Sequence, residues 1–175
     1  MSKLKEIAAS IDRQVNPPVH LWSPDSKGDI DIRINAQGFW FHEGEAIARD
    51  ALVQLFAGIL WADADEHYLV TPVEKLKIIV EDVPFVVHQM ECVEETWVAV
   101  TNLHEQIIIG QDHPVELRLY QDQWVPYIKV RYDLWARVNR SIYYQWVTEA
   151  IQLQNNDSAL LKLKSQGYEF EVART

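Results

Sequence analysis

Two stretches of the chain carry arginine and tryptophan residues in the same order. The matched residues are Arg33, Trp40 and Arg49 in residues 30–56, and Arg131, Trp135 and Arg140 in residues 127–147. A guanidinium group offers planar, paired donors to phosphate or carboxylate, and an indole face can stack on a base or on the guanidinium itself. These residue types predict a binding site for a small anion, to which Arg137 and Lys75 would add two further cations.

The same side chains also have a purely structural interpretation. Tryptophan and arginine can pack across a hairpin, and Arg33 shares one face of an alternating segment with Asp29 and Asp31. Ion-pair networks and binding sites draw on the same residue types. Convergence of several arginines on one place would therefore favour binding, whereas isolated pairs would favour a structural role.

The sequence lacks the common motifs of phosphate-binding and hydrolytic enzymes. Its six glycines are too scattered for a phosphate loop or a dinucleotide fingerprint, and no Gly-x-Ser-x-Gly occurs. An enzyme would need an acid or base such as Asp31, His42 or Glu81 in a cleft. The sequence thus favours a protein without catalytic residues and leaves an unfamiliar enzyme as the weakest alternative.

Metal and thiol chemistry is also weakly represented. Cys92 is the single cysteine, which excludes an intrachain disulfide, and its alternating strand context predicts a core residue. His67 with Asp63, Asp65 and Glu66 is the densest group of metal-ligating residue types, but it lacks the glycine and spacing of a calcium loop. We interpret this group as a solvated turn and expect neither a metal nor a cofactor.

The composition indicates a soluble, acidic, folded protein. Of 175 residues 48% are hydrophobic, and 16 Lys and Arg stand against 26 Asp and Glu, a formal charge of −10. That charge repels phosphate and disfavours non-specific nucleic-acid binding. No apolar run is long enough to span a membrane, and the N-terminus has no signal-peptide core. We therefore expect a cytoplasmic protein.

Hydrophobic periodicity predicts the elements of the first half. Residues 1–14 have the pattern of a short amphipathic helix, and residues 29–35 (DIDIRIN) alternate as a strand with its isoleucines on one face. Gly38 would close a four-residue hairpin loop in which Ile34 pairs with Phe39 and Arg33 faces Trp40. Residues 46–61 are predicted to form a largely buried helix, followed by a polar loop over residues 62–67.

Strands dominate the prediction from Tyr68 onward. The expected strands are residues 68–71, 76–81, 85–93, 96–101, 106–109, 115–120, 124–131 and 135–138. Asn139 is a plausible cap for a helix over residues 141–153, with Ile142, Trp146, Ala150 and Leu153 on one face. Residues 160–164 and 168–172 form a predicted hairpin. This mixture indicates an α+β fold rather than a parallel doubly wound sheet.

The two arginine–tryptophan stretches each read as strand, turn, strand, helix, which suggests an internal duplication. The strand-rich part of the chain begins near residues 82–84. We therefore expect two domains, an N-terminal α+β domain over residues 1–83 and a C-terminal, β-rich domain over residues 84–175.

Five blocks of sequence resemble a bacterial family known as domain of unknown function 1285. They are PPVHLW (17–22), GDIDIRI (28–34), LVTPVEKLKIIVEDVPF (69–85), TNL with HP (101–103 and 113–114), and VRYDLWARVNRSIYY (130–144). The blocks fall in the family's order and span nearly the whole chain beyond the first predicted helix. One departure is Ala36-Gln37-Gly38, where an acidic residue is expected before the glycine, and it affects only that turn.

The resemblance implies a two-part α+β fold with a duplicated core, a C-terminal half loosely similar to pleckstrin-homology-like barrels, and no established enzyme activity. It also implies a nucleotide-like ligand between the halves and a role in signalling. We therefore expect a ligand-binding or signalling module that holds a small anion. The alternative is a scaffold that binds a protein partner through its C-terminal half.

Overall fold

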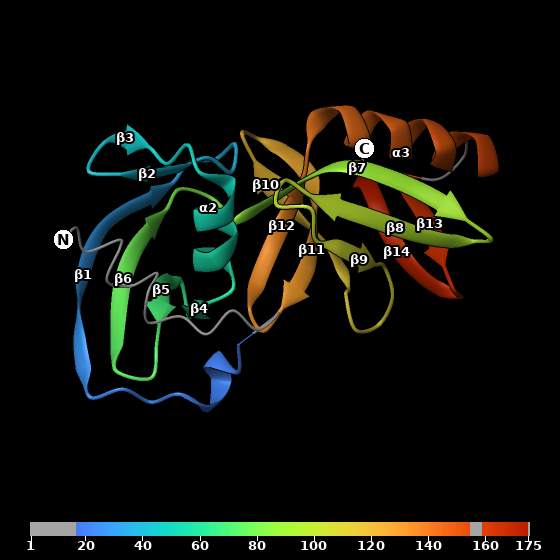
Figure 1. The fold of residues 1–175 in the computed structure, drawn as a ribbon. Coiled ribbons are helices and arrows are strands. Elements are labelled where there is room, and N and C mark those ends of the chain that lie inside the picture. The colour runs from blue at the N-terminus through green and yellow to red at the C-terminus, as the bar shows by residue number, and fades with distance from the viewer. Residues whose placement is uncertain (1–16, 155–158, 175) are drawn as a thin grey trace. The chain divides into compact units, whose positions relative to one another are not determined.

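The computed structural model describes residues 17–154 and 159–174, so the predicted N-terminal helix lies outside the described residues. The chain divides into two compact units (Figure 1). The first comprises the described residues up to Val83 together with Tyr132–Leu134, and the second comprises Pro84–Arg131 and the chain from Trp135 onward. Each unit is built on a six-stranded sheet. The α+β class is therefore as expected.

The first unit combines its sheet with one α-helix and a short 3-10 helix. Its elements are η1 (Val19–Leu21), β1 (Ser26–Ile34), β2 (Trp40–His42), β3 (Glu45–Ala46), α2 (Asp50–Ala57), β4 (Leu60–Asp63), β5 (Glu66–Val70) and β6 (Glu74–Val80). The strand order is β3-β2-β1-β6-β5-β4, with β1 and β6 parallel and the other neighbours antiparallel. The predicted alternation of β1 is confirmed, because Ile32 and Ile34 are completely buried while Asp31 and Arg33 are exposed.

The register of the β1–β2 hairpin differs from the prediction by one residue. Ile34 pairs with Trp40 and Arg33 with Phe41, so Trp40 enters the core and Phe39 is 65% exposed. The cause is a longer loop. The side-chain oxygen of Asn35 accepts hydrogen bonds from the backbone N–H groups of Gln37 and Phe39, and Gly38 takes a φ of +85°.

The helix predicted over residues 46–61 is much shorter than expected. Only Asp50–Ala57 is helical, and the flanking residues form β3 and β4. Leu60 and Ala62 are buried residues of β4, which pairs with β5. The polar loop predicted over residues 62–67 is correspondingly reduced to a tight turn at Ala64 and Asp65 between these strands. Periodicity alone does not distinguish a short buried strand such as β4 from the continuation of a buried helix.

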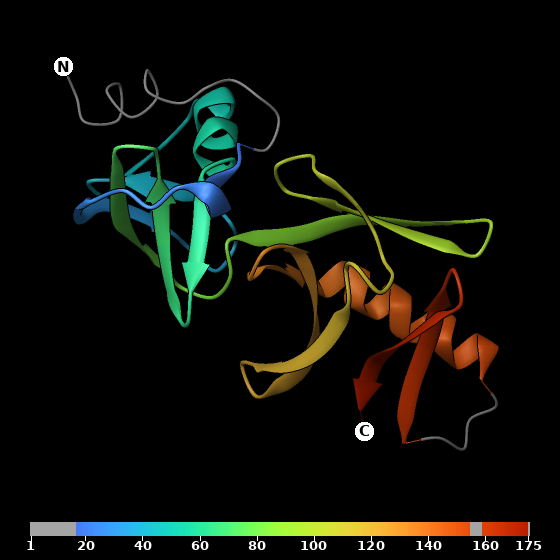
Figure 2. The same ribbon diagram turned by 90° about the horizontal axis from the view of Figure 1, so that it is seen from below.

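The second unit carries a curled sheet, a long helix and a C-terminal hairpin (Figure 2). Its elements are β7 (Phe85–Val93), β8 (Thr96–Thr101), β9 (Gln106–Ile108), β10 (Val115–Tyr120), β11 (Gln123–Arg131), β12 (Leu134–Val138), α3 (Arg140–Leu153), β13 (Leu160–Ser165) and β14 (Tyr168–Arg174). The sheet order is β10-β11-β12-β7-β8-β9, with β12 and β7 parallel. These elements match the predicted strands, helix and hairpin closely.

The core of the second unit lies where α3 meets the strands. Asn139 caps α3, because its side-chain oxygen accepts a hydrogen bond from Ile142 N. Trp146 is completely buried and packs against Trp97 of β8 and Phe170 of β14. Ile142 and Ala150 are buried as predicted, but Leu153 is 72% exposed because the helix ends there.

The two sheets share one topology. Adding six to each strand number of the first sheet converts β3-β2-β1-β6-β5-β4 into the order of the second sheet read from its other end. In both, the first and last of six consecutive strands pair in parallel at the centre. The predicted strand–strand–helix stretches exist, but topology matches β1 and β2 with β7 and β8, not with β11 and β12. The similarity between the two units therefore concerns the whole sheet.

Candidate functional site

Two of the predicted cations of the first unit contact acidic side chains. Arg33 contacts Glu81 at 3.4 Å, not Asp29 or Asp31 as the structural interpretation expected. Lys75 lies 3.8 Å from Asp63, and its ammonium stands 4.2 Å from the ring centroid of Tyr68. Both contacts neutralise the cations locally.

Trp40 and Arg49 are placed differently. Trp40 is 3% exposed and stacks on Phe56 of α2, with ring centroids 6.4 Å apart. Its ring thus belongs to the core and presents no open face for the stacking role predicted for it. The indole nitrogen of Trp40 finds no hydrogen-bond partner among the described residues. Arg49 is exposed at the N-terminus of α2, where its side chain makes no capping hydrogen bond.

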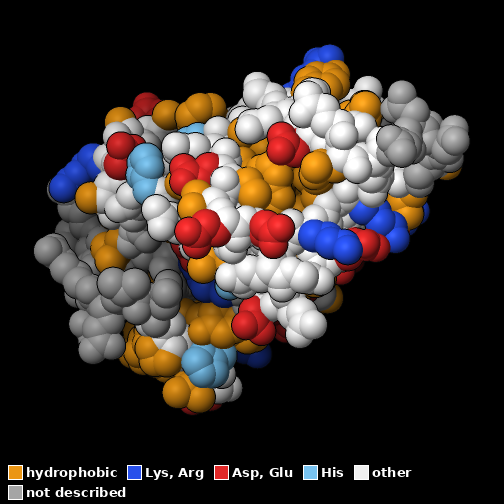
Figure 3. All heavy atoms as spheres, turned by 90° about the vertical axis from the view of Figure 1, so that its right-hand side faces the viewer, with side chains coloured by type: hydrophobic (Ala, Val, Ile, Leu, Met, Phe, Trp, Pro, Cys, Tyr) orange, Lys and Arg blue, Asp and Glu red, His pale blue; other side chains and the backbone are white. Residues whose placement is uncertain are grey.

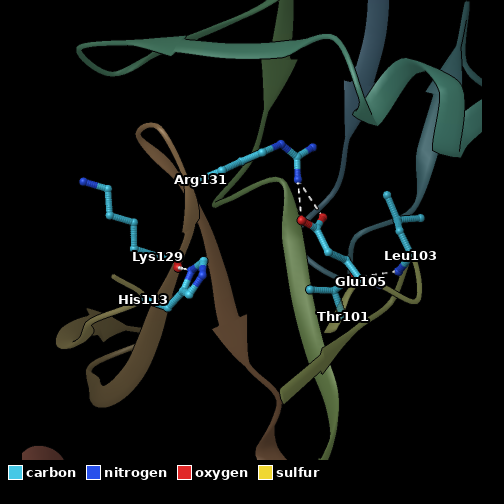
Figure 4. A network of polar contacts seen from close by, with 6 residues as sticks. All are labelled: Thr101, Leu103, Glu105, His113, Lys129 and Arg131. Atoms are coloured by element: carbon cyan, nitrogen blue, oxygen red, sulfur yellow. Dashed lines mark hydrogen bonds and ion pairs between the residues drawn. The ribbon is translucent and has the colours of Figure 1, made fainter. Parts of the chain in front are cut away.

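Arg131 is held by a carboxylate in the second unit (Figure 4). Its Nη1 donates to both oxygens of Glu105, at 2.8 and 2.6 Å, and its guanidinium lies 5.4 Å from the ring centroid of Phe85. The hydroxyl of the buried Thr101 accepts hydrogen bonds from the backbone N–H groups of Leu103 and Glu105, which fixes the loop that carries this carboxylate. The Arg131–Glu105 ion pair is therefore half-buried, and its role is structural.

A second group of cations is distributed over aromatic rings of β10, β11 and β12. We call it the cation–aromatic cluster, and its members are Arg118, Tyr120, Tyr127, Lys129, Trp135 and Arg137. The guanidinium of Arg118 lies 4.0 Å from the ring centroid of Trp135 and 5.3 Å from that of Tyr127. The Lys129 ammonium lies 5.9 Å from Trp135, and Arg137 stands 4.0 Å from the ring centroid of Tyr120.

The members of the cation–aromatic cluster differ from one another in burial and in ion pairing. Trp135 and Arg137 are each 7% exposed, whereas Arg118 keeps 37% of its side chain in solvent. Arg118 donates from Nε and Nη2 to Glu116 Oε2 at 3.3 and 3.0 Å. Lys129 directs its ammonium away from the Arg131–Glu105 pair (Figure 4), and among the described residues no carboxylate lies within ion-pair distance of it.

The structure brings together only some of the predicted residues. Trp135 and Arg137 lie in the cluster, whereas Arg140 of α3 donates to the hydroxyl of Tyr144 at 3.2 Å. Arg118 and Lys129 were not predicted. Strand alternation carried the signal, since it places Arg118 with Tyr120 on one face of β10, and Tyr127 with Lys129 on one face of β11.

Histidine and cysteine chemistry gives no further site. No group of metal-ligating side chains that could hold an ion occurs within residues 17–154 and 159–174. His67 is partly buried, and burial lowers its pKa. Cys92 is exposed rather than in the core, and the pKa of its thiol is raised by desolvation and by Glu149. A raised pKa disfavours the reactive thiolate. No helix of the described chain has the length and apolar character of a membrane span.

Comparisons with known proteins agree with this two-unit architecture. Residues 17–83 match the family described as "Domain of unknown function (DUF1285), N-terminal domain", and residues 84–172 match "Protein of unknown function (DUF1285), C-terminal domain". A crystal structure of a DUF1285 family protein from Silicibacter pomeroyi DSS-3 is 32% identical, with a TM-score of 0.88 over 100% of this chain and 97% of that one.

A second similar crystal structure, of a DUF1285 family protein from Shewanella baltica OS155, is 29% identical. Its TM-score is 0.56, and the match covers 67% of this chain and 91% of that one. Among curated proteins, no sequence matches this chain.

Proposed function

The chain belongs to the DUF1285 family, which is named for its unknown function, and from that premise we propose that it is a binding module for a small, nucleotide-like anion. The observation that carries the proposal is the placement of two cations, Arg118 and Lys129, against the single indole of Trp135. Three cationic side chains gather in this cluster although the whole chain has a formal charge of −10. Such a local exception to the global field is what recognition of an anion requires.

The residue types suit a phosphate attached to a planar group. Guanidinium and ammonium groups bind phosphate oxygens through charge-assisted hydrogen bonds, and Tyr120, which is partly exposed, is the aromatic member of the cluster on which a planar group can stack. Because Arg118 retains partial exposure, an anion from solvent can reach its guanidinium group. We propose that the anion binds at Arg118 and Lys129, with Trp135 supporting both.

Thermal unfolding in the presence of AMP and of adenosine tests this function. At a concentration about 100 times Kd, AMP should raise the Tm by roughly 5 °C, since a ligand that binds only the folded state stabilises it by about 2.7 kcal/mol. Adenosine should have a much smaller effect. Arg118→Gln should remove most of the AMP shift. An unchanged shift in that variant would contradict the proposal.

Arg174→Gln is the matched control for that variant. Arg174 also stacks on a tryptophan, Trp124, at 5.0 Å, and it also pairs with a glutamate, Glu171. Trp124 pairs with Leu119, one position along from the Arg118–Val125 pair, so its side chain leaves the ladder on the opposite face. Loss of this cation should therefore leave the AMP shift intact.

The second candidate is a scaffold for a protein partner. It is favoured by the exposed apolar pair of Leu119 and Trp124 on the β10–β11 hairpin, which are 62% and 38% exposed. We propose that the curled sheet acts as a pleckstrin-homology-like domain and binds a protein partner at Leu119 and Trp124. A pull-down that is weakened by Leu119→Lys, together with no thermal response to small anions, would favour this candidate over the first.

A further inference from the structure

Glu116 accepts hydrogen bonds from the guanidinium group of Arg118, which an incoming anion would need. Both hydrogen bonds from Arg118 end on one carboxylate oxygen of Glu116, two residues away on the same face of β10. The two side chains are 37% and 54% exposed. An ion pair this open to solvent contributes little stability, so a ligand can displace it at small cost.

Removing Glu116 from Arg118 would change the charge that a ligand meets. In the structure, Glu116 offsets one of the two positive charges on the Trp135 indole. Once the carboxylate has moved away, Arg118 and Lys129 together present two positive charges. A phosphomonoester carries about −1.5 to −2 at pH 7 and matches this pair, whereas a phosphodiester or a carboxylate carries a single negative charge.

We propose that Glu116 is an internal competitor that stands in for the ligand's anionic group, and that the cluster selects phosphomonoesters. This inference rests on the proposed function of the same site. Glu116 holds Arg118 in place while no ligand is bound. The ligand phosphate replaces the carboxylate on Arg118 and contacts Lys129 with its second charge. Lys129 thereby determines the preference for a monoester.

An internal comparison separates this role from ordinary surface pairing. Arg174 donates from Nε and Nη2 to one oxygen of Glu171, at 3.1 and 2.8 Å, in the same geometry as Arg118 and Glu116. Its tryptophan, Trp124, is more exposed than Trp135, and no second cation stacks on it among the described residues. Glu171 therefore provides a carboxylate of equal chemistry outside the cluster.

Calorimetric titration of the full chain with AMP, 3′,5′-cyclic AMP and inorganic phosphate tests the inference. E116Q should bind AMP about two- to fivefold more tightly than the wild type, because the competing ion pair is gone. E171Q should bind AMP as the wild type does. K129Q should lose the preference for AMP over cyclic AMP. Binding of inorganic phosphate nearly as tight as AMP would assign recognition to the phosphate group alone, which also supports selection by charge.

The failures of the inference and of the function are distinguishable. If the wild type binds AMP and E116Q binds it no more tightly, Glu116 is not a competitor, although the module still binds an anion. If K129Q keeps the preference for AMP over cyclic AMP, Lys129 does not select the monoester. If neither the wild type nor E116Q binds AMP or phosphate, the proposed function itself is overturned.

Discussion

At the scale of single residues, the ion pairs of this protein differ in burial, and therefore in how much the loss of one partner should destabilise the fold. Arg131 and Glu105 keep only 17% and 32% of their side chains exposed, whereas Lys162 and Glu169 keep 37% and 46%. Truncating one partner of a shielded pair leaves the other charge poorly solvated, while truncating one partner of an open pair does not. Similar contact distances therefore predict different mutational effects.

Arg131→Ala should lower the free energy of unfolding by about 1–3 kcal/mol, because Glu105 loses both of its short hydrogen bonds. Lys162→Ala should cost much less, because both partners of that pair stay open to solvent. Urea denaturation followed by tryptophan fluorescence compares the two. Equal losses in both variants would mean that burial does not control these pairs.

His67 gives stability a defined dependence on pH. Desolvation lowers its pKa from the ordinary 6.5, and the charge of Asp133 acts in the opposite direction. The unfolded chain therefore takes up a proton at higher pH than the folded chain does. The stabilisation from neutral His67 is complete above pH 6.5. It is lost as the pH falls from 6.5 to the pKa of His67 in the folded state.

We expect His67→Gln to flatten this part of the pH profile. The wild type should lose stability between about pH 7.5 and about pH 5.5, and the variant should lose less over the same interval. His88→Gln, at an exposed position of β7, serves as the control and should follow the wild type. A profile for His67→Gln that is as steep as the wild type's would contradict the assignment. Urea titrations at the two pH values supply the measurement.

At the scale of elements, the two α-helices offer a matched test of capping. Asn139 caps α3 through its side-chain oxygen, whereas Arg49 stands at the corresponding position of α2 without such a bond. Asn139→Ala should destabilise the protein by about 1 kcal/mol, and Arg49→Ser should stabilise it by up to about 1 kcal/mol. Thermal denaturation measures both. Opposite signs are required, since the same interaction is removed in one case and added in the other.

The elements also show what sequence reasoning could reach. The pattern of β-type segments bounded by turn residues located β7, β8 and β10 to the residue, and of these β8 alternates strictly in burial. The sequence pattern failed at the β1–β2 hairpin, where side-chain hydrogen bonds from Asn35 lengthened the loop. Hydrophobic pairing alone selects a register only when the loop length is known.

The site was harder to anticipate than the fold. The arginine–tryptophan pattern predicted Trp135 and Arg137, which lie in the proposed site, but the cations beside Trp135 come from other strands. Trp40 and Trp135 looked equivalent in sequence. A one-residue change of register placed Trp40 in the core beside Phe56. Residue type therefore suggests the proposed chemistry, and packing distinguishes which of these residues lie together.

At the scale of the whole molecule, the net charge opposes the proposed ligand. The formal charge is −10, and on the side shown in Figure 3 acidic side chains surround patches of hydrophobic ones. A phosphomonoester far from the protein feels this overall field, whereas one in contact with Arg118 feels mainly the local cations. Approach and binding therefore respond differently to salt.

The association rate of AMP should accordingly rise with ionic strength. The Debye length falls from about 30 Å at 0.01 M to about 8 Å at 0.15 M, which screens long-range repulsion more than contact attraction. Stopped-flow measurements of AMP binding over this range should show the increase. A rate that falls with added salt would mean that the cations of the cluster, rather than the excess of carboxylates, dominate the field along the path of approach.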